Sequence, residues 1–465
     1  MMALRRKHGS TGAGRRAFGV ALPTTLLLIA TMASASPLAV QRRTLNNGAR
    51  LLVSEQHALP MVVVQIMVDA GARRDPSGKE GLAGLTADLL TEGTKKRTAV
   101  QISETADFIG AAFDTGADVD FASLSLTMLT KDLDTGFDLL SDALLHPSFP
   151  EAEVTRRREA TLASLQAEED EPGRVANRRF LKLLFGDEPY GHPVVGSTES
   201  VRKLTRADIL KFYQENYGPE NAIISIAGDV SADDMAKRME SILAEWKGVS
   251  RGDFVYPPEH AHESEAATIA KPLTQANIVL GERGIARDNP DYYAVTVMNF
   301  ILGGGGFTSR LTNSVRVEGG LAYSVGSVYS VNKAPGSFQV IMQTKNASAA
   351  EAIQRTCSEL DRIRQSQVSD EELDGAKLYL TGSFPMRLDT NMKLAGFAAQ
   401  VEFFHLGDDY ADSYASRINA VSKEDIQRAA QKYLHPDNLD LVVVGNLDTA
   451  KVSAGPPCAK PAPTP

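Results

Sequence analysis

The capping pattern Leu204-Thr-Arg-Ala-Asp-Ile209 recurs as Val421-Ser-Lys-Glu-Asp-Ile426, and the two positions differ by 217 residues. At the same offset Tyr217-Gly-Pro-Glu-Asn221 matches Leu434-His-Pro-Asp-Asn438, and an apolar run ending at glycine follows each turn. Each copy predicts a helix capped by Thr or Ser, a turn containing Pro, and a buried strand. Because cap, turn and strand all match at one offset, we infer a duplication, and a period this long indicates tandem domains.

The segments around the two copies follow one another in the same order in each half. Apolar patterns predict strands first, then a helix, then a further strand and a long amphipathic helix. The expected strands span residues 49–53, 61–69, 122–129, 275–282 and 336–344, and the expected helices 81–91, 133–145, 292–302 and 349–365. This mixture predicts an α+β fold of two homologous α/β-sandwich-like domains. We expect them at residues 36–247 and 272–453, with a linker at 248–271.

The N-terminal residues have the three parts of a secretory signal peptide. Five basic residues precede or flank a largely apolar stretch at 18–32, and Ala33-Ser34-Ala35 supplies the small residues of a cleavage site. The alternative is a membrane anchor, but an anchor needs about 20 apolar residues, and Pro23 interrupts this shorter run. We therefore expect residues 1–35 to be removed on export, with the bacterial periplasm as the destination.

Charge and cysteine content narrow the possible partners. The chain carries a formal net charge of −9, and removal of five basic residues with the signal peptide gives −9 − 5 = −14. This acidic balance argues against binding to nucleic acid or to an anionic membrane surface. We expect no disulfide framework, because Cys357 and Cys458 are the only cysteines. Cys357 falls in a helical pattern and is interpreted as a small buried residue. Cys458 lies in a Pro- and Ala-rich tail, residues 454–465, which we expect to be disordered.

A second informative stretch is Gly81-Leu-Ala-Gly-Leu-Thr-Ala-Asp-Leu-Leu-Thr-Glu-Gly-Thr94. It resembles the zinc-binding segment of the pitrilysin/insulinase-type metallopeptidases, which reads G-L-A-H-F-L-E-H-M-x-F-x-G-T. Such a site needs His at i and i+4 on one helix face, with Glu beside them as general base. Here Gly84 and Asp88 stand at the two His positions and Ala87 stands at the Glu position. The segment is therefore a degenerate zinc site.

The third zinc ligand of the family is also missing. It is a Glu about 75 residues after the second His, within R-x-x-V-x-E-E, and the matching positions here are Ala163 and Ser164. Asp88 alone cannot hold structural zinc, which takes about four N, S or O ligands. The acidic run at residues 168–171 is interpreted as a solvated face, and no His-x-x-x-His pair occurs elsewhere. We expect this chain to bind no metal or other cofactor.

The second half keeps a different motif of the same family. Residues 309–325 closely resemble S-R-L-F-x-x-x-R-E-x-x-G-L-A-Y-S-V, with Thr312 and Val317 as the two departures. The resemblance implies that Arg316 and Tyr323 reach toward a zinc site, hold the peptide and stabilise charge on its carbonyl group. A guanidinium fork and a phenol can both donate to a developing oxyanion. The structural alternative is an Arg in an ion pair on a helix and a Tyr packed in a strand.

The resemblance covers essentially the whole mature chain, and the two-domain architecture is similar to the subunits of the mitochondrial-processing-peptidase subfamily, which act in pairs. It implies a non-catalytic subunit of a heteromeric zinc peptidase, inactive alone, in a heterodimer with a homologous partner that carries His-x-x-Glu-His and the zinc. Unfolded peptides would bind extended along a sheet edge, for which the strand around Phe113, Asp114, Thr115 and Gly116 is the candidate.

Two other classes of function stay open. The first is a binding or structural subunit of the core-protein type found in respiratory complexes, in which Arg316 and Tyr323 contribute nothing to catalysis. The second is a hydrolase with an unrecognised site, which would cleave peptides alone and in the presence of a chelator. The first predicts that replacing Arg316 leaves any complex fully active, whereas the peptidase-subunit hypothesis predicts a large loss.

Overall fold

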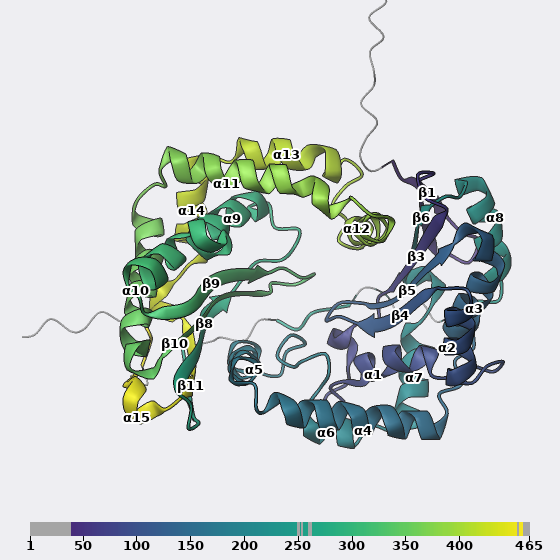
Figure 1. Cartoon of the computed structure of the whole chain (residues 1–465), viewed down its shortest axis with the longest axis horizontal. Helices are drawn as coiled ribbons and strands as arrows, with labels where there is room; N and C mark the ends of the chain where they lie inside the picture. The colour runs from purple at the N-terminus through teal and green to yellow at the C-terminus, as the bar shows by residue number, and fades with distance from the viewer. Residues whose placement is uncertain (1–38, 249–251, 253, 259–262, 453–454, 459–465) are drawn as a thin grey trace, which may run out of the picture. The chain divides into compact units, whose positions relative to one another are not determined.

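The computed structural model describes residues 39–248, 252, 254–258, 263–452 and 455–458, and contains two sheets with helices packed against them (Figure 1). The first sheet has the order β1 (Gln41–Thr44), β2 (Arg50–Glu55), β6 (Ala222–Gly228), β3 (Met61–Val68), β5 (Ala122–Leu129) and β4 (Ala112–Ala117). The second has the order β7 (Ala266–Ala270), β11 (Asp440–Gly445), β8 (Gln275–Arg283), β10 (Ser337–Lys345) and β9 (Ala322–Ser330).

The helices divide between the two halves of the sequence. Those of the first half are α1 (Leu82–Asp88), α2 (Ala99–Phe108), α3 (Leu133–Leu145), α4 (Glu151–Glu168), α5 (Pro172–Phe185), α6 (Thr198–Arg202), α7 (Arg206–Asn216) and α8 (Ala232–Ile242). Those of the second half are α9 (Tyr292–Asn299), α10 (Ala349–Gln365), α11 (Asp370–Ser383), α12 (Asn391–Phe403), α13 (Tyr410–Ala420), α14 (Lys423–Tyr433) and α15 (Leu447–Ala450).

The duplicated segment occupies the same place in both sheets. The Thr205 and Ser422 hydroxyl groups each accept a hydrogen bond from the backbone N–H three residues later and form capping boxes with Asp208 and Asp425. The strands that follow, β6 and β11, are buried along their whole length. Each runs parallel to one neighbour and antiparallel to the other. The predicted α+β fold with two homologous halves is confirmed.

One helix from each half packs against the sheet of the other half. Helix α5 belongs to the first half, yet its Val175 and Phe180 pack with Val279 and Val442 of the second sheet. Helix α12 belongs to the second half, but its Ala398, Ala399 and Phe403 pack against the first sheet. The exchange covers the second face of each sheet, which accounts for the continuous burial of β6 and β11.

The structure corrects two expectations from the sequence, one about the linker and one about the cysteines. Strand β7 lies at residues 266–270, inside the segment expected to be a linker, and pairs in parallel with β11. The expectation of no disulfide is wrong, because Cys357 of α10 is bonded to Cys458, with 5.4 Å between their Cα atoms. The fold brings the tail back to α10 although the two cysteines are 101 residues apart. The bond ties residues 455–458 of the expected disordered tail to the second domain.

The expected signal peptide, residues 1–35, lies outside the described residues. Within the part of the chain that the structure describes, no helix combines the length and apolar character needed to cross a membrane.

Candidate functional site

Arg316 and Tyr323 come together at the edge of the second sheet. Arg316 lies in the π-helical segment η7 (Thr312–Glu318), and Tyr323 lies near the start of the edge strand β9. The Arg316 guanidinium carbon is 5.7 Å from the Tyr323 ring centre and 4.8 Å from that of Phe307. Tyr323 is 72% exposed and Phe307 is 70% exposed. The three side chains form an exposed cluster, the Arg316 cluster.

The polar atoms of this cluster are not used inside the chain. Among the described residues, neither the Arg316 guanidinium nor the Tyr323 hydroxyl forms a hydrogen bond or an ion pair. The contacts of Arg316 are with ring faces, which orient the guanidinium without occupying its N–H donors. This geometry differs from the structural alternative of a salt-bridged Arg and a packed Tyr.

The other polar residues of the motif hold the segment in place. Arg310, which is buried, donates two hydrogen bonds to Glu372 of α11, from Nε to Oε1 at 2.6 Å and from Nη2 to Oε2 at 2.8 Å. The hydroxyl of Thr312 donates to the backbone carbonyl of Val325 in β9, at 3.3 Å. Thr312 therefore joins η7 to the edge strand, which gives this departure from the family pattern a structural role.

Glycines let the preceding segment approach β9. Residues 300–304 form a second π-helical segment, η5 (Phe300–Gly304). A Cβ atom on Gly303 would lie 2.6 Å from the backbone nitrogen of Ser327, closer than real Cβ atoms come. Gly306 adopts a positive φ of 59°, which favours glycine. The glycine run is therefore required where the chain passes along the edge strand just before Phe307.

The contribution of the Arg310–Glu372 pair to the stability of the fold depends on pH. Hydrogen bonds from Arg310 lower the pKa of Glu372 to about 2. Because this pKa is depressed, the pair stabilises the fold above the unfolded value of about 4.5, and the contribution is lost as pH falls toward 2.

We predict that Glu372→Gln lowers the free energy of unfolding at pH 7 by about 1.5–3 kcal/mol, because it breaks a charge-assisted pair. Measured by denaturant unfolding, the difference from the wild type should shrink between pH 4.5 and pH 2. Glu371→Gln, at an exposed neighbouring position, is the matched control and should change little. A pH-independent difference for Glu372→Gln would contradict the assignment.

The degenerate zinc positions lie on α1 and α4. Ala87 is fully buried and Asp88 is half-buried on α1, whereas Ala163 and Ser164 are exposed on α4. Burial raises the pKa of Asp88, and the nearby Arg157 opposes the shift. Within the described residues, no group of three or more His, Cys, Asp or Glu side chains is placed to hold a metal ion.

The space beside Gly84 is occupied by another part of the chain. A Cβ atom at this position would lie 2.9 Å from the backbone oxygen of Val194 and 3.6 Å from its Cγ1 atom. Val194 belongs to the loop after Pro189-Tyr190-Gly191, and its side chain packs against the first domain's core. The site has therefore lost its ligands and also the room for a side chain at the first ligand position.

Polar residues just before α1 form structural contacts. The Asp75 carboxylate accepts hydrogen bonds from the backbone nitrogens of Gly81 and Ala83, at 2.8 and 2.7 Å, and so holds the start of α1. Burial raises the pKa of Asp75 to about 8. Arg74 donates two hydrogen bonds to Asp69, at 2.9 and 2.8 Å. These contacts explain how α1 keeps its place without a metal ion.

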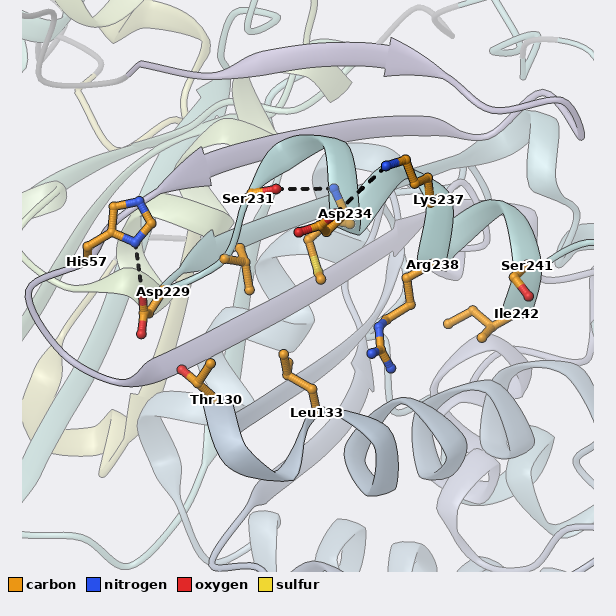
Figure 2. A pocket seen from close by; sticks show the side chains of 12 residues that line it. His57, Thr130, Leu133, Asp229, Ser231, Asp234, Lys237, Arg238, Ser241 and Ile242 are labelled. Carbon is orange, nitrogen blue, oxygen red and sulfur yellow. Dashed lines mark hydrogen bonds and ion pairs between the residues drawn. The ribbon is translucent and has the colours of Figure 1, made fainter.

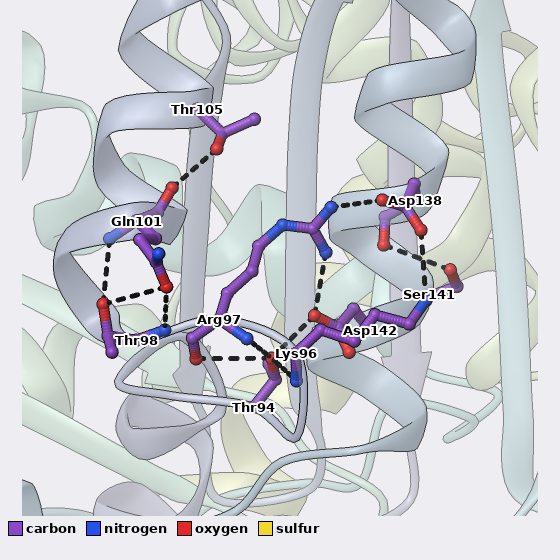
Figure 3. A network of polar contacts seen from close by, with 9 residues as sticks. All are labelled: Thr94, Lys96, Arg97, Thr98, Gln101, Thr105, Asp138, Ser141 and Asp142. Carbon is purple, nitrogen blue, oxygen red and sulfur yellow. Dashed lines mark hydrogen bonds and ion pairs between the residues drawn. The ribbon is translucent and has the colours of Figure 1, made fainter.

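A polar network holds the turn at the end of the same segment (Figure 3). The Thr94 hydroxyl donates to the buried Asp142 carboxylate at 2.6 Å and accepts from the backbone nitrogen of Arg97 at 2.9 Å. The Arg97 guanidinium also donates to Asp142, at 2.9 Å. Gly93 has a φ of 135°, and a Cβ atom there would meet Pro150 at 2.9 Å. Gly93 and Thr94 therefore serve the fold, which explains their presence in a segment without zinc ligands.

The candidate peptide-binding strand lies at the edge of the first sheet. Strand β4 pairs with β5 on one side only among the described strands. Phe113, Thr115 and Gly116 are half-buried, Asp114 is exposed, and Gly116 faces open space. Strands β4 and β9 occupy the same place in their sheets, so Phe113 and Tyr323 lie on corresponding edges. The structure does not place these residues in one contact cluster.

A surface pocket between the β2–β3 turn and α8 offers another group of polar side chains (Figure 2). His57 Nδ1 lies 2.7 Å from Asp229, and this hydrogen bond raises the pKa of the imidazole. The nearby Ser231 hydroxyl accepts from the backbone nitrogen of Asp234 and caps α8. Figure 2 shows Ser231 directed toward α8 and His57 directed toward Asp229, so the three do not form a catalytic chain of hydrogen bonds.

The duplicated α+β fold, with a degenerate ligand helix in one half and an exposed Arg and Tyr in the other, defines a metallopeptidase homologue. Family models agree: the insulinase model (peptidase family M16) matches residues 50–198, and the peptidase M16 inactive domain matches residues 203–380. The chain belongs to peptidase family M16 and is an inactive-type member.

Relatives and solved structures match over most of their own length. An uncharacterized zinc protease of Streptomyces coelicolor is 27% identical, over 85% of this chain and 87% of the relative. The zinc protease YmxG of Bacillus subtilis, also uncharacterized, is 23% identical over 86% and 96%. A crystal structure of a peptidase M16 inactive domain from Pseudomonas fluorescens superposes with a TM-score of 0.82 at 28% identity, over 88% of this chain and 98% of that one.

Proposed function

We propose that this protein is the non-catalytic subunit of a heteromeric zinc peptidase. Its partner would be a homologous subunit that carries His-x-x-Glu-His and the zinc ion, and this chain would supply Arg316 and Tyr323 to the partner's active site. The observation that carries the proposal is the Arg316 cluster, in which both polar groups are presented at an exposed surface with no partner among the described residues.

The contrast between two arginines of one motif supports this assignment. Arg310 is buried, and its Nε and Nη2 atoms both donate to Glu372, so these two donors are used for structure. Arg316, six residues later, is half-buried between rings and its donors are available. A rigid fork of free N–H groups beside a free phenol can bind a peptide carbonyl and stabilise the charge that develops on it. That chemistry has a use only if a nucleophile is supplied from outside this chain.

We also propose that unfolded peptide binds in extended form along β4. An open edge strand offers unpaired backbone donors and acceptors to a peptide. Alternate side chains of the bound peptide would contact the same face of the sheet. Phe113, Asp114, Thr115 and Gly116 would line this edge, since β4 pairs with β5 on one side only among the described strands. We propose, in addition, that the chain is exported with removal of residues 1–35 and assembles with its partner as a heterodimer in the periplasm.

The competing functions predict different surfaces. A purely structural subunit has no need for an exposed, unpaired Arg and Tyr. It remains the second candidate because a chain of complex III from Candida albicans has the same fold. That chain superposes with a TM-score of 0.75 at 17% identity, over 88% of this chain and 97% of that one. A hydrolase that acts alone finds no support in the His57 group, since Ser231 caps α8.

Reconstitution tests the proposal. The purified mature chain and a zinc-bearing homologue from the same cell are assayed separately and mixed, with an unfolded fluorogenic peptide as substrate. We expect cleavage only in the mixture, abolished by a chelator and restored by zinc. Cleavage by this chain alone that survives the chelator would overturn the proposal in favour of an unrecognised hydrolase site. Full activity of the homologue alone would favour the structural subunit.

A further inference from the structure

A second cavity lies in the C-terminal half, and none of the residues of the Arg316 cluster lines it. It has a volume of about 500 Å³ and is bounded by α12, the loop before α9, and the start of α13. Its walls are mostly apolar and aromatic, from Tyr292, Phe397, Phe404 and Tyr410. Its charged side chains are Arg287, Arg387 and Lys393, and none of the residues that line it carries a carboxylate. A purely cationic lining is unusual in a chain with a net charge of −9.

Arg287 is held rigidly in this cavity. Its guanidinium carbon lies 3.8 Å from the ring centre of Tyr292 and 5.2 Å from that of Tyr410. Its Nη2 atom donates to the Tyr410 hydroxyl at 2.6 Å. The backbone nitrogen of Arg287 donates to the carbonyl of Asn332 at 2.8 Å, which fixes the loop. The two ring faces and the Tyr410 hydroxyl thus orient the Arg287 guanidinium, and its other N–H groups stay available to a ligand.

Two carboxylates near the cavity are paired with basic side chains. Glu402, the sole acidic residue of α12, pairs with Arg50 at 3.0 Å and with Arg42 at 3.5 Å. Asp389, which does not line the cavity, pairs at 2.8 Å with Lys393, so this one lining cation already has a counter-charge. Among the described residues, Arg287 and Arg387 pair with no carboxylate. Arg387 is exposed, but Arg287 is half-buried, and a half-buried guanidinium without a counter-charge is costly, so an anion that enters the cavity would offset this cost.

We propose that this cavity binds an organic carboxylate whose neighbouring group is apolar or aromatic. Arg287 and Arg387 would bind the carboxylate, for which a planar guanidinium fork is well matched. The Tyr410 hydroxyl accepts from Arg287, so its own hydrogen is free to donate to the ligand. The aromatic walls would cover the apolar group. The C-terminus of a peptide that ends in an apolar residue, or an acidic side chain beside one, has this chemistry. The inference needs neither a partner subunit nor zinc and is independent of the proposed function.

Calorimetric titration of the purified chain tests the inference. The probes are N-acetyl-Ala-Ala-Phe with a free carboxylate, the same peptide as an amide, N-acetyl-Ala-Glu-Phe-amide, and inorganic phosphate. We expect the free acid to bind and its amide to bind at least tenfold more weakly. If the Glu-containing amide binds as well as the free acid, the carboxylate comes from a side chain, which also supports the inference. Failure of both carboxylate peptides to bind, or equal binding of phosphate, would overturn it.

Variants locate the binding. Arg287→Met and Arg387→Ala should each weaken binding of the free acid by about tenfold to a hundredfold, as loss of a charge-assisted hydrogen bond does. Arg287→Lys keeps the charge but loses the fork, and it keeps the test valid if Arg287→Met fails to fold. Arg417→Gln is the matched control, because Arg417 lies over Tyr293 and pairs with Asp409 outside the cavity. Binding unchanged in folded Arg287 and Arg387 variants would place the ligand elsewhere and overturn the assignment.

Discussion

Arg316→Ala lowers kcat of the reconstituted peptidase by about a hundredfold to a thousandfold, with little change in KM. This is the size of effect seen when one donor to a developing oxyanion is removed, because the interaction strengthens only in the transition state. The side chain forms no ion pair or hydrogen bond within the described residues, so its removal should leave the fold intact. Steady-state kinetics on the mixed subunits, with circular dichroism of the variant, measure both.

Arg362→Ala is the matched control for this experiment. Arg362 is an exposed arginine of α10 whose side chain lies 3.5 Å from Glu359, and it lies outside the Arg316 cluster. Its replacement should leave kcat unchanged. If Arg316→Ala and Arg362→Ala are equally active, the Arg316 cluster has no catalytic role and the structural-subunit alternative is favoured.

Gly84→His should fail to restore a zinc ligand and should destabilise the chain. The new Cβ atom would lie 2.9 Å from the Val194 backbone oxygen, so the loop or α1 must move to admit the imidazole. Overpacking of this kind costs about 1–3 kcal/mol. The combined variant with Ala87→Glu, Asp88→His and Ser164→Glu, which restores all the family positions, should also bind no stoichiometric zinc. Denaturant unfolding and metal analysis after dialysis provide the two measurements.

Gly375→His is the control for the added imidazole. Gly375 is an exposed helical glycine of α11 with no atom within 4 Å of its Cβ position, so the same substitution should be neutral or slightly stabilising. Stable Gly84→His protein, with zinc bound by the combined variant, would show that the loop does not close the site.

The duplication could be predicted from the sequence because its signals are local. A capping box at Thr205 or Ser422 is defined by four consecutive residues, and the helix, turn and buried strand follow directly. The missing ligands at Gly84, Asp88 and Ser164 were visible for the same reason, since a fixed spacing can be checked residue by residue. The Arg310–Glu372 pair was not visible, because it joins a motif to a helix 62 residues away.

Features that depend on long-range packing were beyond the sequence pattern. The apolar face of α5 shows that something covers it, but not that the cover is the second sheet. The bond between Cys357 and Cys458 likewise needs the tail to return to α10. From the sequence, Gly84 could be recognised as a lost zinc ligand. Only the structure shows that Val194 occupies the space that a side chain at this position would need. The same holds for Arg287, whose aromatic neighbours come from α9 and α13.

Chemical rescue tests most directly whether the Arg316 guanidinium acts in the partner's reaction. In the reconstituted peptidase carrying Arg316→Ala, free guanidinium ion is added at non-denaturing concentrations and compared with sodium at equal ionic strength. A saturable rise in kcat with guanidinium alone is the predicted result. A rate that stays low at every guanidinium concentration, or an Arg316→Ala variant as fast as the wild type, would contradict the division of labour between the two subunits.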